Sequence, residues 1–223
     1  MNRIVILNFH GIGVPRRDLE PGEAPYWVSE DFFTRILDLI PEAPLPVAIT
    51  FDDGNASDLD LAAPRLIDRG LTAEVFALSG RLDRPGSLSV AGLRELEAAG
   101  FRIGTHGVDH VDWRRAAPET LAREIDESRA RLAEVLGREI DTAAIPFGSY
   151  GPHVLRALRR AGLARVFTSD GGLANPEAWL RPRTSLRGDM DVPRVRAILD
   201  GTESPLRRLR RSAAMRWKRG LSD

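Results

Sequence analysis

Short apolar runs alternate along this chain with longer segments in which apolar residues recur every three or four positions. The short runs favour β-strands, and the longer segments favour amphipathic helices. Serine or proline precedes several of the long segments and glycine follows them, which are common signals of helix starts and ends. The predicted strands cover residues 4–9, 47–51, 72–78, 101–105, 142–145, 165–168 and 180–186, and the predicted helices cover residues 29–40, 58–69, 89–99, 118–136, 152–161 and 193–200.

Seven strands that alternate with helices are typical of parallel β/α units. Such units form an open sheet or a barrel, and seven strands suit an incomplete barrel better than an eight-stranded one. A length of 223 residues fits one domain with a sizeable core. We therefore predict an α/β barrel over residues 1–203, followed by a basic C-terminal helix or tail over residues 204–223.

The C-terminal segment 206–219 carries seven basic residues and no acidic one. Leu206, Leu209, Ala213 and Trp217 recur in it at helical spacing, which favours a terminal helix packed on the barrel. Contact between the basic residues and an anionic membrane is the alternative. Nothing else in the chain supports binding to nucleic acid.

The composition is ordinary for a globular protein, with 43% hydrophobic and 29% charged residues and a formal net charge of zero. The apolar run at residues 4–9 is too short for the core of a signal peptide. No run approaches the roughly 18 apolar residues of a membrane span. We expect a cytoplasmic protein, peripheral at the inner membrane face if its basic C-terminus contacts lipid.

Two adjacent carboxylates, Asp52 and Asp53, end the second predicted strand. The carboxyl ends of parallel strands are where β/α folds place their chemistry. Two neighbouring carboxylates repel each other unless a cation lies between them or one stays protonated, so this pair predicts a metal site. Because the chain has no cysteine, the other ligands would be His, Asp, Glu or water, which favours zinc or a similar divalent ion.

Three of the four histidines, His10, His106 and His110, lie at or just after predicted strand ends. His106 and His110 are four residues apart, a spacing that lets two imidazoles meet one ion from a helical turn or a coiled loop. This spacing is weak evidence alone, and its combination with the Asp-Asp strand end is much more specific. The fourth histidine, His153, follows a predicted helix start and is expected at the surface.

Three short motifs follow one another at these strand ends. Residues 50–54 read Thr-Phe-Asp-Asp-Gly, residues 106–110 read His-Gly-Val-Asp-His, and residues 145–150 read Ile-Pro-Phe-Gly-Ser-Tyr. In order and spacing they resemble the T-F-D-D-G, H-S/T-x-x-H and substrate-groove motifs of the polysaccharide deacetylase family, over residues 3–186. The resemblance implies a distorted (β/α)7 barrel and metal-dependent removal of acetyl from an N-acetylated sugar in a glycan or glycan precursor.

The resemblance also implies a role for each motif residue. Asp53, His106 and His110 would hold a divalent metal, Zn²⁺ with Co²⁺ or Ni²⁺ as alternatives, and Asp52 would be the general base. Three protein ligands leave positions open for water and substrate, which agrees with this assignment. The residues that would line the substrate groove are Pro146, Phe147, Gly148 and Tyr150, although core packing of the two aromatic rings is an open alternative.

An amine leaving group needs a general acid, and common family members use a late histidine for it. No histidine follows His153 here. Residues 7–11, Leu-Asn-Phe-His-Gly, instead resemble the N-terminal Tyr/Phe-His of circularly permuted members such as poly-N-acetylglucosamine deacetylases. The resemblance implies that His10 is the acid, and a buried structural histidine is the alternative.

The sequence departs from the family pattern at three positions. Gly107 replaces a Ser or Thr, Val111 replaces a proline, and Ala144 stands where many members have an arginine that pairs with the base. Our hypothesis is that Arg183 supplies this charge from the last strand. Two other functions remain open: hydrolysis of a small non-sugar amide, and glycan binding by a degenerate member without catalysis.

Overall fold

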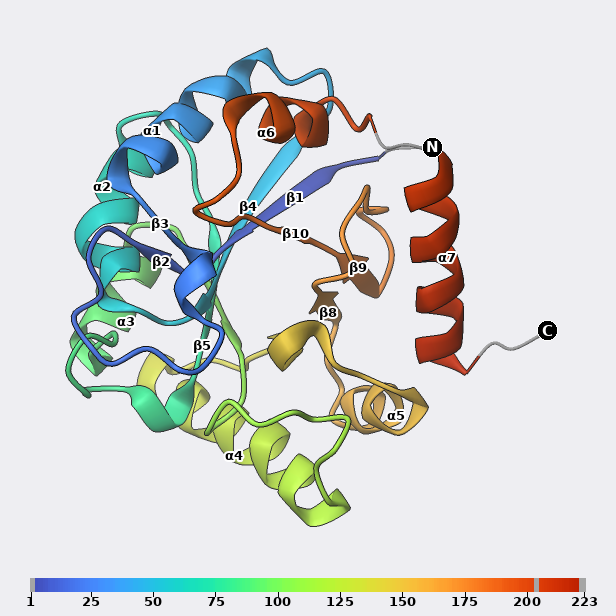
Figure 1. The fold of residues 1–223 in the computed structure, drawn as a ribbon. Coiled ribbons are helices and arrows are strands. Elements are labelled where there is room, and N and C mark those ends of the chain that lie inside the picture. The colour runs from blue at the N-terminus through green and yellow to red at the C-terminus, as the bar shows by residue number, and fades with distance from the viewer. Residues whose placement is uncertain (1–2, 203–204, 221–223) are drawn as a thin grey trace.

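Parallel strands ring the centre of the molecule in the computed structural model, which describes residues 3–202 and 205–220, and helices lie outside this ring (Figure 1). The sheet runs in the order β10, β1, β4, β5, β6, β7, β8, β9. Its strands are β1 (Val5–Phe9), β4 (Val47–Asp53), β5 (Glu74–Ala77), β6 (Arg102–Thr105), β7 (Thr142–Ala144), β8 (Arg165–Thr168), β9 (Leu180–Pro182) and β10 (Thr184–Ser185). This arrangement confirms the predicted deacetylase-like barrel.

The last predicted strand, residues 180–186, is two short strands interrupted at Arg183. β9 pairs with β8, and β10 pairs with β1, so one stretch of chain joins both edges of the sheet. At the break, the Arg183 N–H donates to the carbonyl of Thr168 at 2.9 Å, and further on the Leu186 N–H donates to that of Asn8 at 2.8 Å. The expectation of one continuous strand was wrong because the pairing partner changes at Arg183.

Alternation along β1 separates the outer core from the interior of the barrel. Val5, Leu7 and Phe9 belong to the large apolar cluster under the helices, whereas Ile6 packs in a small cluster with Phe76. Neighbouring strand residues point to opposite faces, so this is the expected pattern for a strand buried on both sides. The helices are α1 (Glu30–Leu39), α2 (Ala63–Ile67), α3 (Val90–Ala98), α4 (Pro118–Leu136), α5 (Pro152–Arg160), α6 (Val192–Leu199) and α7 (Pro205–Arg219).

The helix boundaries follow the predicted signals closely. Ser29 caps α1, since its hydroxyl accepts a hydrogen bond from the Phe32 N–H at 3.1 Å. The predicted helix 58–69 differs in its first turns, where Asp58–Ala62 is wound as a π-helix before α2. No described helix is both long and apolar enough to cross a membrane.

A loop near the N-terminus, residues 13–26, was not predicted to have structure. It connects β2 (Gly11–Ile12) to β3 (Trp27–Val28), which pair as a separate two-stranded sheet, and it ends in the short 3₁₀ helix η1 (Ala24–Tyr26). This loop brings Glu20 and Tyr26 to the rim of the barrel, where both contact histidines described below.

The C-terminal helix α7 lies along the outside of the barrel near α5 (Figure 1). Of its predicted apolar residues, Leu209 is 67% exposed and Ala213 is also exposed, while Trp217 is 64% exposed and has the Arg114 guanidinium 4.3 Å from its ring centre. The side chain of Leu206 lies outside the described ones. The side that packs carries Lys218. The predicted boundary between residues 203 and 204 lies outside the described residues.

Candidate active site

Asp53, at the end of β4, faces two histidines that follow β6. The Nε2 atoms of His106 and His110 each lie 3.6 Å from Asp53 Oδ1. One ligand atom from each of the three residues falls within 4.8 Å of the others. Asp53 Oδ1 is buried and has no hydrogen-bond partner among the described residues. A buried unpaired acceptor costs about 1–3 kcal/mol, so this oxygen between two imidazoles fits a divalent cation.

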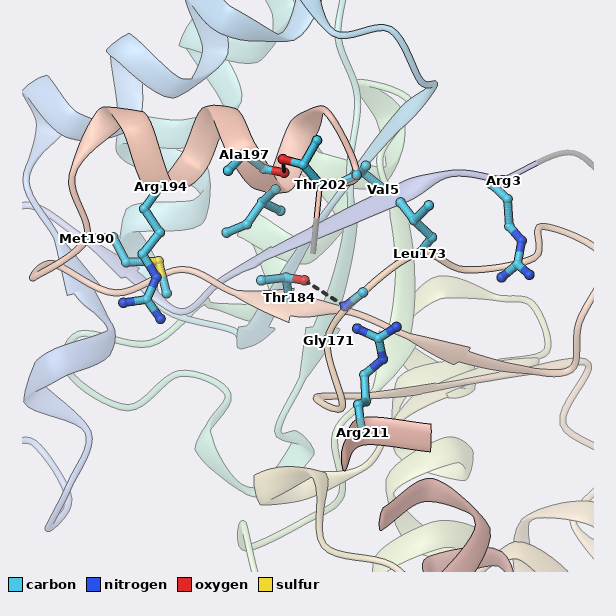
Figure 2. Close-up of a pocket in the computed structure, with 13 residues that line it drawn as sticks. Arg3, Val5, Gly171, Leu173, Thr184, Met190, Arg194, Ala197, Thr202 and Arg211 are labelled. Atoms are coloured by element: carbon cyan, nitrogen blue, oxygen red, sulfur yellow. Dashed lines mark hydrogen bonds between the residues drawn. The ribbon is translucent and has the colours of Figure 1, made fainter. Parts of the chain in front are cut away.

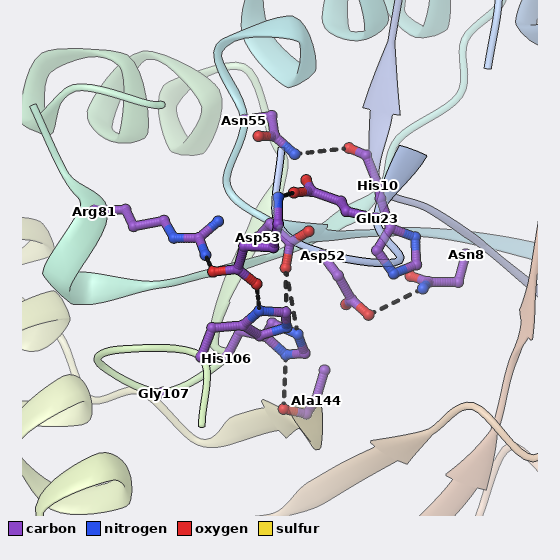
Figure 3. Close-up of polar contacts among 12 residues, drawn as sticks. Asn8, His10, Glu23, Asp52, Asp53, Asn55, Arg81, His106, Gly107 and Ala144 are labelled. Carbon is purple, nitrogen blue, oxygen red and sulfur yellow. Dashed lines mark hydrogen bonds and ion pairs between the residues drawn. The ribbon is translucent and has the colours of Figure 1, made fainter. Parts of the chain in front are cut away.

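Both imidazoles are held by the nitrogen that faces away from Asp53. His106 Nδ1 lies 2.9 Å from the carbonyl oxygen of Ala144 (Figure 3). His110 Nδ1 lies 2.6 Å from Glu20 Oε2. Because both partners are acceptors, each Nδ1 carries the proton and each Nε2 presents a lone pair toward Asp53. The backbone carbonyl of Ala144 thus has a role at the position where the family places an arginine.

Burial keeps His106 in the form that binds metal. The side chain of His106 is 2% exposed, and this burial lowers its pKa to about 4 against the opposing effects of Asp52 and Asp53. A neutral imidazole is the ligand form of histidine. Glu20 in turn forms an ion pair with Arg81, which holds the carboxylate beside His110.

The loop between the two histidines is steadied by α4, and this accounts for Gly107. The Glu124 carboxylate, which is fully buried, accepts the Val108 N–H at 2.9 Å and the Asp109 N–H at 3.2 Å. A Cβ at position 107 would lie 2.5 Å from Glu124 Oε2, and the backbone φ there is 98°. Glycine is therefore required, and Glu124 holds the loop in place of the hydroxyl that the family motif supplies.

Asp52, one residue earlier, has a quite different environment. Its two oxygens accept from Arg183 Nη1 and Nη2 at 2.7 Å each, and Oδ2 also accepts from Asn8 Nδ2 at 2.9 Å. Burial alone would raise the pKa of Asp52, but the charge and hydrogen bonds of Arg183, together with the nearby histidines, hold this pKa well below its ordinary value. Arg183 is itself fully buried, and it lies where the hypothesis drawn from the sequence needs a positive charge beside Asp52.

Strained backbone gathers in this region. Among the described non-glycine residues, four have positive φ, and three of them are Asp53 (75°), His110 (56°) and Phe147 (57°). Each such residue costs on the order of 1 kcal/mol or more, and persists only where its surroundings hold it. Such strain is characteristic of functional sites.

His10 lies at the same rim, directly after β1. Its ring packs on that of Tyr26 with centroids 4.8 Å apart, and its carbonyl accepts from Asn55 Nδ2 at 3.2 Å (Figure 3). Its Nδ1 is buried and has no partner among the described residues. Figure 3 shows the His10 ring on the same side of the site as the Asp52 carboxylate.

Of the four predicted groove residues, only Phe147 is exposed. It has 60% of its surface accessible and stacks on His110, with ring centroids 4.3 Å apart. Pro146, Gly148 and Tyr150 are buried. The Tyr150 hydroxyl donates to Asp170 Oδ2 at 2.7 Å, so this ring is a core aromatic and does not form part of an exposed wall.

Two tryptophans of the chain have structural roles, and His153 lies at the surface. Trp113 is fully buried in the core, and Trp179 donates from Nε1 to the carbonyl of Leu163 at 2.8 Å. His153 is exposed, as predicted. The site residues that the sequence did not reveal are Asn8, Glu20, Tyr26 and Glu124, because each acts through a partner distant in sequence. Asn8 lies in the motif of residues 7–11, but that motif gave a role to His10 alone.

Comparison with known proteins agrees with this geometry. A family model described as Polysaccharide deacetylase matches residues 41–166. The Bacillus subtilis protein YxkH, which carries the name of the same family, is 25% identical over 129 residues, or 58% of this chain and 46% of YxkH. The chain therefore spans about half the length of this curated relative.

Solved structures share the fold over nearly the whole chain. The Streptococcus pyogenes deacetylase PplD in complex with acetate matches with a TM-score of 0.76 at 22% identity, covering 91% of this chain and 99% of that chain. IcaB from Ammonifex degensii matches with a TM-score of 0.75 at 23% identity, covering 90% and 98%. At these identities the likeness establishes the barrel fold alone.

Proposed function

The chain belongs to the polysaccharide deacetylase family, and from this premise we propose that it is a metal-dependent N-deacetylase. Its substrate would be an N-acetylated sugar in a glycan or glycan precursor. The observation that carries the proposal is the contrast between two adjacent carboxylates: Asp53 Oδ1 is buried and unpaired before two imidazoles, while Asp52 is paired with a buried arginine.

Asp53, His106 and His110 would hold the divalent metal, with zinc as the first choice and cobalt or nickel as alternatives. Their donor set of one carboxylate and two imidazoles suits such ions. When bound, the ion polarises the acetyl carbonyl and makes water more acidic. Three protein ligands leave coordination positions free for water and substrate.

Asp52 and His10 would move the protons of the hydrolysis. Asp52 accepts a proton from the attacking water as the water oxygen bonds to the carbonyl carbon. His10 gives a proton to the amine nitrogen as the carbon–nitrogen bond breaks, so that acetate and a free amino sugar are the products. The Asp52 carboxylate is ionised because Arg183, with the nearby histidines, holds its pKa well below the ordinary value.

Arg183 replaces the motif arginine that is missing at Ala144. Its bidentate contact fixes the orientation of the Asp52 carboxylate, and a guanidinium is suited to this geometry because its donors match the two oxygens. The charge therefore comes from the last strand of the barrel instead of from β7.

Two aromatic rings at the rim would bind the sugar. Phe147 stacks on His110, and Tyr26 packs on His10. One aromatic ring therefore lies beside a proposed metal ligand, and the other lies beside the proposed general acid. Sugar rings bind well to exposed aromatic faces, which combine apolar area with fixed geometry. Tyr26 is half-buried.

The test is acetate release from chitooligosaccharides and other N-acetylated sugars by protein loaded with Zn²⁺, Co²⁺ or Ni²⁺. We expect turnover with at least one ion and none after substitution of Asp52→Asn. Turnover of small non-sugar amides alone would favour the first alternative. Metal binding and glycan binding without any turnover would favour the non-catalytic alternative.

We also propose that α7 contacts anionic lipid through its outward face. Leu209 and Trp217 are exposed on a helix rich in arginine, a combination that favours a negatively charged membrane surface. Beside α7, a groove of about 560 Å³ is lined by Arg3, Arg194 and Arg211 and, among the residues that the structure describes, by no acidic one (Figure 2).

Sedimentation with vesicles tests the lipid contact. We expect the protein to bind vesicles that contain phosphatidylglycerol and not vesicles of phosphatidylcholine alone. Salt should weaken the binding, and so should the double substitution Leu209→Ser with Trp217→Ser. Equal recovery in the supernatant with both vesicle types at low salt would end this proposal. Location in the cell stays a prediction.

A further inference from the structure

Lys218, the only lysine of the chain, reaches inward from α7. Its Nζ donates to Asp170 Oδ1 at 2.6 Å and to the carbonyl oxygen of Gly148 at 3.1 Å, and it lies 5.0 Å from the centre of the Tyr150 ring. The side chain of Asp170 is 4% exposed and that of Lys218 is 24% exposed, so the ion pair is partly buried. Removing Lys218 would leave the buried Asp170 carboxylate without its counter-charge, which costs more than breaking a surface pair.

The Asp170 carboxylate joins three parts of the chain. Besides Lys218, it accepts the hydroxyls of Tyr150 and Thr168, both at 2.7 Å. Burial, followed by the charge of Asp170, raises the pKa of Tyr150, so its hydroxyl stays a donor. The end of β8, the segment after β7 and helix α7 are therefore tied to one buried group.

The carbonyl that Lys218 holds belongs to the short 3₁₀ helix η5 (Pro146–Gly148), which carries Phe147. Phe147 and Gly148 both have a φ of 57°. For phenylalanine this conformation is unfavourable, so neighbouring contacts must hold it. Gly148 packs closely on the next loop, since a Cβ there would lie 2.9 Å from Ser169 Cβ.

We propose that Lys218 is a positioning residue of the active site, and that α7 is thereby part of the catalytic unit. By fixing the Gly148 carbonyl and Asp170, Lys218 keeps η5 in the conformation that lays Phe147 on the ring of His110. This inference rests on the proposed function for its effect on rate, whereas its structural half, the restraint of η5, is independent of any activity.

A double-mutant cycle tests the route through Phe147. Lys218→Met should lower kcat/KM about tenfold, because small displacements of a positioned group are costly in rate. In the Phe147→Ala background the same change should cost about twofold or less, since coupled residues are non-additive. Arg216→Met, which removes a positive charge at an exposed position of the same helix, is the matched control and should leave kcat/KM unchanged.

Lys218→Met leaves the Asp170 charge buried, so we add the variant Lys218→Met with Asp170→Asn. This variant removes both charges and keeps an oxygen that can accept from Tyr150 and Thr168. It should fold, bind metal as the wild type does, and show the same loss of kcat/KM. A fold as stable as the wild type with unchanged kcat/KM would overturn the proposal.

Hydrogen exchange over residues 146–151, measured by mass spectrometry, tests the restraint without any substrate. Exchange should rise in Lys218→Met and in the double variant and stay at the wild-type level in Arg216→Met. Unchanged exchange in both Lys218 variants would overturn the proposal whatever the activity. Faster exchange in a protein that deacetylates nothing would leave the restraint of η5 intact and instead reject the proposed function.

Discussion

Asp52 and Asp53 are neighbours in sequence and opposites in environment. Both side chains are buried, but the oxygens of Asp52 are satisfied by Arg183 and Asn8. Asp53 Oδ1 has no hydrogen-bond partner among the described residues and faces two imidazole nitrogens at 3.6 Å. Protein groups alone compensate the negative charge of Asp52, whereas compensation of the Asp53 charge requires a cation.

This difference shows how one strand end can serve two chemical roles. Adjacent residues of a strand diverge, and the positive φ of Asp53 turns it further from its neighbour. Arg183 compensates the charge of Asp52 from the closing strand of the barrel, while the loop after β6 brings His106 and His110 to Asp53. The two sets of partners come from different strands, so each can be perturbed separately.

The largest effect is expected from Arg183→Met. It leaves the Asp52 carboxylate buried without its counter-charge, and breaking a buried pair in this way costs about 3–5 kcal/mol of stability. The loss of the guanidinium should also raise the pKa of Asp52 and abolish most activity. Urea unfolding and acetate release measure the two effects.

The matched control for that variant is Arg181→Met. Arg181 lies two residues earlier on β9 and donates from Nε to the carbonyl of Ala178 at 2.9 Å, away from Asp52. It should keep activity close to the wild type. Equal losses in the two variants would show that Arg183 has no special relation to Asp52.

A second effect concerns acid stability of the metal-free protein. The pKa of His106 is about 4 in the folded protein, against an ordinary 6.5 when unfolded. Between these pH values the His106 imidazole is protonated in the unfolded chain and neutral in the folded protein. Its titration therefore leaves the free energy of unfolding unchanged above about pH 6.5 and lowers it as the pH falls toward about 4. The loss amounts to about 3 kcal/mol.

Urea unfolding of chelator-treated protein at about pH 7 and about pH 4.5 measures this loss. His106→Asn removes the titrating group. The free energy of unfolding should therefore differ less between the two pH values than it does in the wild type, by most of that amount. Asp52 does not interfere, because its lowered pKa places its own contribution below about pH 4. An identical pH dependence in the variant would contradict the assignment of a buried neutral His106.

A smaller effect is expected from Glu20→Gln, which weakens the acceptor on His110 Nδ1. Groups that orient a metal-bound histidine commonly contribute 10–100-fold in affinity, so the Kd for Zn²⁺ should rise by about this factor. Asp18→Asn removes an exposed carboxylate from the same loop and should leave the Kd unchanged. A titration with a competing chelator gives both values, and an unaltered Kd in Glu20→Gln would remove Glu20 from the site.

The sequence predicted the residues that sit in contiguous motifs at strand ends. Asp52, Asp53, His106 and His110 could be found because one strand end positions each pair. Arg183 was reached by a different route, as an arginine of the last predicted strand that could supply the charge of the missing motif arginine. The seven-strand barrel followed from the alternation of apolar runs, which reports burial on both faces of a parallel strand.

Other features could not be read from the sequence because they depend on distant pairings. Glu20 meets His110 across 90 positions, and Lys218 meets Asp170 across 48. Tyr150 was placed in the substrate groove by its motif, but Asp170 draws its hydroxyl into the core. The break at Arg183 reflects a change of pairing partner, which hydropathy does not encode.

The central claim is that Asp53 binds metal and Asp52 does not. Metal content after loading with Zn²⁺ and gel filtration, measured in the wild type, Asp52→Asn and Asp53→Asn, tests it directly. We predict one equivalent in the wild type and in Asp52→Asn, which should nevertheless be inactive, and little metal in Asp53→Asn. Equal metal content in the two variants, whether both retain the ion or both lose it, would contradict the division of roles between these adjacent carboxylates.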